Sequence, residues 1–386
     1  MAYNNAIPKK SNPKKSVIIA GASVIALVAL LIFVPILMAF SNSLTITDSI
    51  DATSHASSSN SPLNQSKSPS PESGVQSSSS RGQTSQISTS TTAVPPQEPK
   101  EINELRRYAL TKINEDRAKF GLSPVLLSDN QAAQVHSNDV FATKQISHWL
   151  TNGEKPYMTY SRYGGLGNVG QNVAVEGYKA DETVGCQYGL LMCESIKAKG
   201  AIDRAEHDMV YNDKECCNDG HRDNILDKDH THVSIGITYD KYYFAFVQNF
   251  ENQYVTWSDP ISYHADLKEV KMSGTFSTGM KADSMQIYYD ALPSNEVYLE
   301  NRDRTSYDNG EAVAAVIPAG WYLENSSLPV IHASNWRVNN QDFEISFPLG
   351  DAMIGHGNGI YTVILWGIKD NGDKVPVSNT SIILSN

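Results

Sequence analysis

The sequence lacks the short motifs that mark several common kinds of catalytic site. It contains no Gly-x-Ser-x-Gly string, which would place a nucleophilic serine on a sharp turn, and no His-Glu-x-x-His string, which would place two zinc ligands on one helix. Its four cysteines form no Cys-x-x-Cys pair of the kind found in zinc ribbons. Covalent catalysis therefore has no motif to support it, and zinc binding by cysteines is the less favoured interpretation.

Positive charge is also scarce. The 386 residues hold 31 Lys and Arg against 42 Asp and Glu, for a formal net charge of -11. A basic cluster occurs only near the start of the chain, at Lys9, Lys10, Lys14 and Lys15. Because nucleic acids are contacted mainly through Lys and Arg, this balance argues against nucleic acid as a partner. The length predicts about two or three domains.

One long apolar run is present, from Val17 to Phe40, directly after the lysine cluster. It is long enough for a helix across a hydrocarbon core of about 30 Å, and longer than the apolar region of about 7–15 residues in a secretory signal. We predict a transmembrane signal anchor over residues 16–40, with residues 1–15 as a cytoplasmic basic tail. A cleaved signal ending near Ala39 is the alternative. Both place the chain after Ser41 outside the cell, at the cell surface.

The four cysteines fit this outward location, where disulfides form and persist. They lie close together in the sequence, at Cys186, Cys193, Cys216 and Cys217. The geometry of a disulfide is hard to meet across one peptide bond, so we expect Cys216 and Cys217 not to pair with each other. Each would instead bridge to Cys186 or Cys193, in one of two ways. Zinc binding and a reduced set are the alternatives.

Composition and periodicity divide the middle of the chain. Residues 41–98 are rich in Ser, Thr, Pro and Gln and predict a disordered stalk that holds the folded part away from the membrane. Residues 99–252 contain three segments with helical spacing and then an aromatic and β-branched hairpin with Asp240-Lys241 at its turn. The helical segments are Glu101–Phe120, Ser128–Lys144 and Ala201–Asn212. Helices followed by antiparallel strands predict an α+β layer structure.

After Asn252 the helical periodicity ends. Short apolar or alternating runs follow, separated by Gly, Asn, Asp and Pro. They predict an all-β sandwich domain of immunoglobulin-like type over residues 254–386, although no Cys-Trp-Cys core signature is present. The runs are Glu269–Phe276, Met285–Tyr289, Val297–Tyr298, Ala312–Pro318, Leu328–Ala333, Asp342–Phe347, Tyr361–Ile368 and Thr380–Leu384.

An ordered set of short strings lies within residues 99–252. The strings are Ile113–Leu122 (INEDRAKFGL), Ala133–Val140 (AQVHSNDV), Ile146-Ser147-His148, Gly170–Ala174 (GQNVA), Gly220–Leu226 (GHRDNIL), Val233–Ile237 (VSIGI) and Val247–Phe250 (VQNF). In this order they resemble the prokaryotic type of the CAP superfamily, the cysteine-rich secretory, antigen 5 and pathogenesis-related 1 proteins, also called SCP domains. The resemblance implies an α-β-α sandwich with a central cleft.

The resemblance also implies that two histidines and two acidic residues line the cleft. The histidines map to His148 and His221. Two neutral imidazoles with carboxylates suit zinc or another divalent cation, and they also suit acid–base catalysis. Gln171, however, stands at the first acidic position, and an amide neither acts as a base nor supplies charge. We therefore expect this cleft to bind a ligand and not to catalyse a reaction.

The second acidic position has two candidates. A helix around residues 202–211 would place Glu206 near the centre of its apolar face, and Asp213 would fall on the same line if the helix continues. Both are candidates for the cleft and for any catalysis there. An alternative is that Glu206 only pairs with a cation such as Arg222. Arg222 itself could bind a carboxylate or a phosphate, or brace its own loop.

These observations predict a membrane-anchored extracellular protein that acts as a binding or adhesion module. The ligand class is left open among lipid, glycan and protein, because a fold does not fix a function. An enzyme is the less favoured interpretation, and its form would be a metal-dependent hydrolase of peptides or envelope polymer. In a third interpretation the CAP domain is a scaffold and the β-sandwich contacts the partner.

Overall fold

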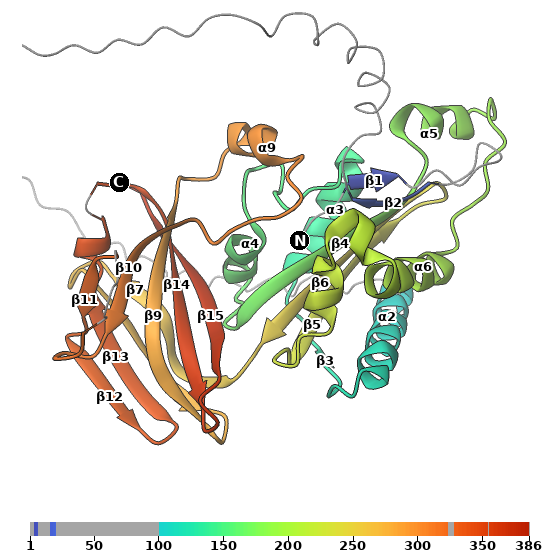
Figure 1. Cartoon of the computed structure of the whole chain (residues 1–386). Helices are drawn as coiled ribbons and strands as arrows, with labels where there is room; N and C mark the ends of the chain where they lie inside the picture. Colours follow the sequence, from blue (N-terminus) through green and yellow to red (C-terminus); the bar gives the residue numbers. More distant parts are fainter. Residues whose placement is uncertain (1–3, 7–15, 21–99, 323–327, 354, 386) are drawn as a thin grey trace, which may run out of the picture. The chain divides into compact units, whose positions relative to one another are not determined.

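The computed structural model describes residues 4–6, 16–20, 100–322, 328–353 and 355–385 (Figure 1). All of these residues belong to one compact unit. The predicted stalk, and the predicted anchor from residue 21 onward, lie outside the described residues. Among the residues that the structure describes, no helix is long and apolar enough to cross a membrane.

The first residues of the predicted anchor form a strand. Strand β2 (Ser16–Ala20) pairs antiparallel with β1 (Asn4–Ala6) and with β4 (Asn168–Gly177), where Ser16 lies opposite Gly177. The edge of β4 offers unpaired backbone groups that a further strand can satisfy. For residues 16–20 the strand therefore replaces the predicted helix.

One sheet forms the centre of the segment from residue 100 to 252. Its strand order is β1-β2-β4-β6-β5-β3, with β3 at Leu126–Leu127, β5 at His232–Tyr239 and β6 at Tyr243–Asn252. Strands β5 and β6 form the predicted hairpin. Its turn is closed by the Asp240 backbone N–H, which donates to the Tyr243 carbonyl at 2.9 Å.

Helices cover both faces of this sheet. Along β6, Phe244 and Phe246 pack in a buried cluster with α2 (Lys100–Lys119) and α6 (Ala198–Tyr211). The alternate residues Ala245 and Val247 pack in a second buried cluster with α3 (Ala132–Thr143). Because successive side chains of a strand point to opposite faces, this alternation places the sheet between two helical layers. The α+β class and the three layers implied by the resemblance are therefore present.

The second helix begins later than predicted. The pattern placed its start at Ser128, but the Ser128 backbone N–H donates to the Val233 carbonyl at 2.9 Å and so extends the strand pairing of β3. Helix α3 starts at Ala132, whose N–H donates to the side chain of Asn130 at 2.9 Å. A strand contact from a distant part of the chain decides this boundary.

The shorter helices position loops and the site. They are α4 (Pro156–Arg162), α5 (Ala180–Gln187), α7 (Asp213–Cys217), α8 (Gly220–Ile225), α9 (Asn295–Asn301) and the 3-10 helix η1 (Gly350–Met353).

The segment after Asn252 contains two further sheets. One has the order β11-β10-β9-β14-β15 and the other β12-β13-β8-β7. The strands are β7 (Val255–His264), β8 (Glu269–Phe276), β9 (Met280–Asp290), β10 (Glu311–Ile317), β11 (Val330–His332), β12 (Asn335–Asn339), β13 (Asp342–Pro348), β14 (Gly359–Lys369) and β15 (Lys374–Leu384).

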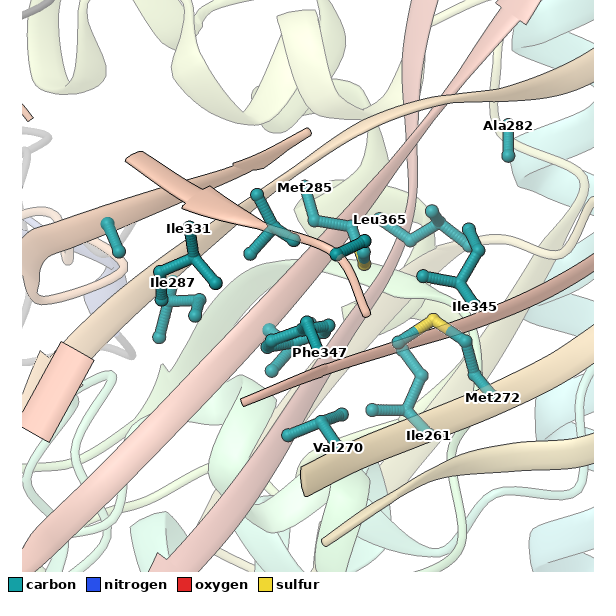
Figure 2. Close-up of a cluster of buried hydrophobic side chains, with 14 of the residues drawn as sticks. Ile261, Val270, Met272, Ala282, Met285, Ile287, Ile331, Ile345, Phe347 and Leu365 are labelled. Carbon is teal, nitrogen blue, oxygen red and sulfur yellow. The ribbon is translucent and has the colours of Figure 1, made fainter. Parts of the chain in front are cut away.

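The two sheets share one core. Figure 2 shows Val270, Met272 and Ile345 from one sheet beside Met285 and Leu365 from the other, all in one buried cluster. Two sheets packed in this way form a β-sandwich. The β10–β11 pair is parallel, whereas the other pairs of these two sheets are antiparallel. An immunoglobulin-like arrangement of the strands stays a prediction.

One predicted strand of this region is wrong. Val297 and Tyr298 lie in helix α9, because the Ser294 side chain accepts a hydrogen bond from the Val297 N–H at 3.4 Å and caps the helix. The sequence prediction also missed β7 and β12. Strand β7 is irregular, with breaks in its pairing to β8 near Asp259, so its alternation is weak.

The sandwich is docked on the first domain. The Lys155 ammonium pairs with Asp290 at 2.8 Å and with Asp308 at 2.7 Å, and the Ser381 N–H donates to the Ser161 hydroxyl at 3.0 Å. A buried apolar cluster also joins the two parts. Its members are Ala132, Tyr157, Met158, Tyr160, Val169 and Ile360, with Tyr307 packed against them.

All four cysteines are in disulfides, but the expected pairing is wrong. Cys186 bonds to Cys193, with 5.5 Å between their Cα atoms, and Cys216 bonds to the adjacent Cys217. Helix α5 ends at a turn in which Gly189 has a φ of +70° and the Leu190 N–H donates to the Gly185 carbonyl. This turn brings Cys193 back to Cys186. Because these two cysteines bond to each other, neither can bond to Cys216 or Cys217.

Candidate functional site

His148 lies fully buried in the loop that follows α3 and contacts Gln171 of β4. Its Nδ1 is 2.8 Å from the Gln171 Oε1, and the Gln171 Nε2 donates to the Asn249 Oδ1 at 3.1 Å. Because an amide oxygen only accepts, Nδ1 of His148 carries the proton of the neutral ring. The Nε2 lone pair is then the reactive position, and this atom is buried with no hydrogen-bond partner among the described residues.

Burial keeps the imidazole of His148 neutral. Loss of solvent lowers the pKa of His148 well below its ordinary value, and the nearby rings of His136 and His221 lower it further. The hydrogen bond to Gln171 acts in the opposite direction but does not compensate. His148 contacts Gln171, and the His221 carbonyl accepts from the side chain of the adjacent Asn172 at 3.2 Å, so the two histidines reach neighbouring residues of β4.

His221 is held by Asp213. The Asp213 Oδ1 is 2.7 Å from the His221 Nδ1, while Oδ2 accepts from the backbone N–H groups of His221 at 2.7 Å and Arg222 at 3.1 Å. Asp213 opens α7 and His221 lies in the first turn of α8, so the short turn between them sets this geometry. Burial lowers the pKa of His221, although Asp213 favours the protonated ring. Asp213 therefore orients the imidazole and has little capacity left for another partner.

Glu206 is buried on α6 and is linked to His221 only through two amide side chains. The Gln248 Nε2 donates to its Oε2 at 2.7 Å, and the Asn172 Nδ2 donates in turn to the Gln248 Oε1 at 3.2 Å and to the His221 carbonyl at 3.2 Å. Burial raises the pKa of Glu206 to about 8, so the carboxyl is largely protonated at neutral pH.

Arg222 does not pair with Glu206 in the contacts that the structure describes. Its guanidinium donates to the Val210 carbonyl and lies over the Phe120 ring, 4.7 Å from the ring centroid. These contacts brace the α8 loop against the end of α6. The interpretation of Arg222 as a brace therefore agrees with its observed partners.

Tyr307 is a site residue that sequence reasoning missed. It lies in the segment between α9 and β10, and its ring meets the His148 ring edge to face at 4.6 Å between centroids. Its hydroxyl accepts a hydrogen bond from the Gln171 backbone N–H at 3.2 Å. Burial raises the pKa of Tyr307, so the phenol stays neutral. No local motif marks this residue, because its partners lie far away in the sequence.

The donor set does not fit a typical zinc site. His148 offers Nε2, and His221 would present its Nε2 because Nδ1 is bound to Asp213, a carboxylate contact that commonly orients zinc-binding histidines. Gln171 adds no charge, and the carboxylate of Asp213 is already engaged by three donors. Catalytic zinc usually has three protein ligands. Two imidazoles alone fall short, so a cation between them stays a prediction.

A second group of side chains that could ligate a metal also does not form a metal site. Among the described residues, Asp213, Cys216 and Cys217 have potential ligand atoms within 4.8 Å of one another. The two sulfurs are bonded to each other, and metal ligation requires thiolates. This group therefore offers no metal site in the oxidised protein.

Comparison with known proteins gives one family match within the first domain. Residues 110–250 match the family model described as CAP, the cysteine-rich secretory protein family. One similar solved structure is an extracellular protein containing a SCP domain from Bacillus anthracis str. Ames, with 20% identity and a TM-score of 0.27 over 42% of this chain and 45% of that one. This chain thus spans less than half the length of that protein. No curated protein matches the chain.

Proposed function

Because residues 110–250 belong to the CAP superfamily, we propose that the protein is an extracellular binding or adhesion module anchored in the membrane. The CAP domain and the β-sandwich act as one binding body. The CAP cleft serves to hold the two domains together, and the ligand is bound elsewhere on this body.

The main support for this proposal is that Tyr307 packs against His148 and Gln171. Tyr307 from the sandwich side of the chain contacts both His148 and Gln171, and neither of these residues has an exposed surface above 1%. A hydrolase needs its base and its substrate within hydrogen-bond reach. With Tyr307 in this position, His148 and Gln171 contact protein and have almost no surface open to a substrate.

The outward location is supported by the chemistry of the cysteines. Both disulfides are formed within the CAP domain, and disulfides are typical of proteins outside the cytoplasm. The apolar residues 21–40, which follow β2, form a run of 20 residues, about the length that a membrane anchor needs. Lipid, glycan and protein remain the ligand classes that this location makes available.

One observation favours the second candidate, a hydrolase. The Asp213–His221 pair has the geometry in which a carboxylate orients an imidazole for proton transfer. Against it, Gln171 replaces a base, and Glu206 is protonated near neutral pH. The pair therefore supports a hydrolase only if Tyr307 moves away from the cleft.

The test compares binding and hydrolysis in the same preparation. Cells displaying the full chain are applied to surfaces coated separately with lipid vesicles, glycans or matrix proteins, with cells displaying a chain that lacks residues 98–386 as the control. We expect retention on one coat and no change in the His148→Ala, His221→Ala double variant. Failure on every coat, together with cleavage of a peptide or polymer that the double variant loses, would favour the hydrolase.

A further inference from the structure

A pocket of about 350 Å³ lies between the CAP domain and the sandwich, away from the two histidines. Its lining combines residues from the loop before α3, from the end of α4, from β6 and from the start of β7. Aromatic rings and acceptor groups dominate it: Tyr160, Tyr163, Tyr254, Trp257, Asp129 and Glu251. Pockets at domain junctions are common ligand sites.

The lining carries negative charge without a balancing cation. Asp129 and Glu251 are the carboxylates, and among the described residues that line the pocket none is Lys or Arg. Basic groups are nearby, but each has its own partner: Arg162 pairs with Glu154 at 2.7 Å, and Lys369 pairs with Asp229. The excess of negative charge therefore belongs to the pocket itself.

Glu251 is the central group. Its side chain has no exposed surface, and its Oε2 accepts from the Tyr160 hydroxyl at 2.8 Å and from the Gln253 Nε2 at 2.6 Å. Its Oε1 is buried and has no hydrogen-bond partner among the described residues. Buried carboxylates are normally paired with a cation, because an unpaired buried charge is costly. Glu251 thus lines the pocket and has one oxygen without a donor among the described residues.

The aromatic residues favour a cationic donor over a neutral one. A cation above the face of a Trp or Tyr ring is attracted by the ring electrons, most strongly where water is excluded. Trp257 is half-buried and presents ring surface to a ligand. The Tyr163 and Tyr254 rings already have protein cations over them, Arg162 at 4.8 Å and Lys369 at 5.5 Å from the ring centroids. The Tyr254 hydroxyl is directed away, since it donates to the Asp229 carbonyl at 2.7 Å.

We propose that this pocket binds an organic ammonium group, with Glu251 as its counter-charge and the Trp257 ring as its aromatic wall. The ammonium could come from a lysine side chain of a protein or from an amino sugar, which share this chemistry. The inference rests on the proposal that the protein is a binding module, and it names the class of ligand.

The test uses pairs of probes that differ only in charge. Nα-acetyl-lysine amide is compared with its Nε-acetylated form, and glucosamine with N-acetylglucosamine, by titration calorimetry on the full chain in detergent. We expect the charged member of at least one pair to bind and its acetylated partner to bind at least about tenfold more weakly. Binding of the lysine derivative would identify a protein side chain as the source of the ammonium group, and binding of glucosamine would identify an amino sugar. Equal binding within both pairs, or binding by neither, would overturn the inference.

The matched variants are Glu251→Gln and Glu104→Gln. The first keeps the shape of the side chain and an oxygen for Tyr160 but removes the charge, and we expect it to weaken ammonium binding by about tenfold or more. The second removes an exposed carboxylate from α2 and should leave binding unchanged.

A second pocket variant keeps the inference testable if Glu251→Gln does not fold. Trp257→Leu removes one aromatic wall from a half-buried position and should also weaken ammonium binding. If Glu251→Gln folds and binds the ammonium probe as well as the natural chain does, the inference is overturned. If Glu251→Gln does not fold, unchanged binding by Trp257→Leu overturns it. If no probe binds but displayed cells are still retained on a coat, the ammonium inference fails while the binding module stands.

Discussion

The protonation of Glu206 makes the stability of the CAP domain depend on pH in an unusual direction. Most carboxylates stabilise a fold when ionised, but burial raises the pKa of Glu206 from 4.5 to about 8. The folded protein therefore holds this proton over a pH range in which the unfolded chain has released it. Its contribution to stability is fully present below about pH 4.5 and is lost as the pH rises to about 8.

The magnitude follows from the size of this shift. At 1.36 kcal/mol for each pKa unit, the rise from 4.5 to about 8 corresponds to about 5 kcal/mol in the free energy of unfolding. The variant Glu206→Gln is the matched control, because its amide is neutral at every pH. It also offers an oxygen to the Gln248 Nε2, as the protonated acid does.

The assay is urea unfolding of both proteins at several pH values from 5 to 9. All other titrating groups are shared, so the difference between the two proteins isolates Glu206. We expect the variant to gain stability relative to the natural chain as the pH rises, by a few kcal/mol in total. Parallel curves over this range would refute the inference that the buried carboxyl is protonated in the folded state.

Three further predictions concern the cleft and the cysteines. Zinc should bind the full chain weakly, and the double variant His148→Ala, His221→Ala should abolish that binding in calorimetry; equal binding by both proteins contradicts the site. Gln171→Glu should tighten zinc binding by about tenfold or more, because it adds a charged ligand; no change contradicts the role of the amide. Peptide mapping without reductant should recover Cys186–Cys193 and Cys216–Cys217 as the bonded pairs, and any cross-link between them contradicts the structure.

Patterns that depend on neighbours in the sequence predicted much of the fold. The hairpin of β5 and β6 follows from alternation with a turn at Asp240, and Glu269–Phe276 coincides with β8. The resemblance of the string Gly170–Ala174 pointed to Gln171 as a neighbour of His148, and the Gln171 Oε1 lies 2.8 Å from the His148 Nδ1. In each case the determining interactions are either local or follow from the resemblance of the segment to the CAP family model.

Features that depend on distant contacts escaped prediction. Tyr307 contacts His148 and Gln171, which lie more than a hundred positions earlier in the sequence, and no motif around Tyr307 indicates these contacts. The start of α3 was misplaced because Val233 pairs with Ser128. The cysteine pairing was wrong because a single turn at Gly189 decides which sulfurs meet, and spacing alone does not reveal the turn.

The origin of Tyr307 has a practical consequence for work on fragments. A CAP domain cut at residue 252 would lack this cover, and the buried His148 Nε2 would face the solvent. Metals and electrophilic reagents would then reach this imidazole more easily than in the intact chain, where Tyr307 packs against it. Activities measured on the excised domain would describe the fragment, and only the two domains together report what the protein presents to its surroundings.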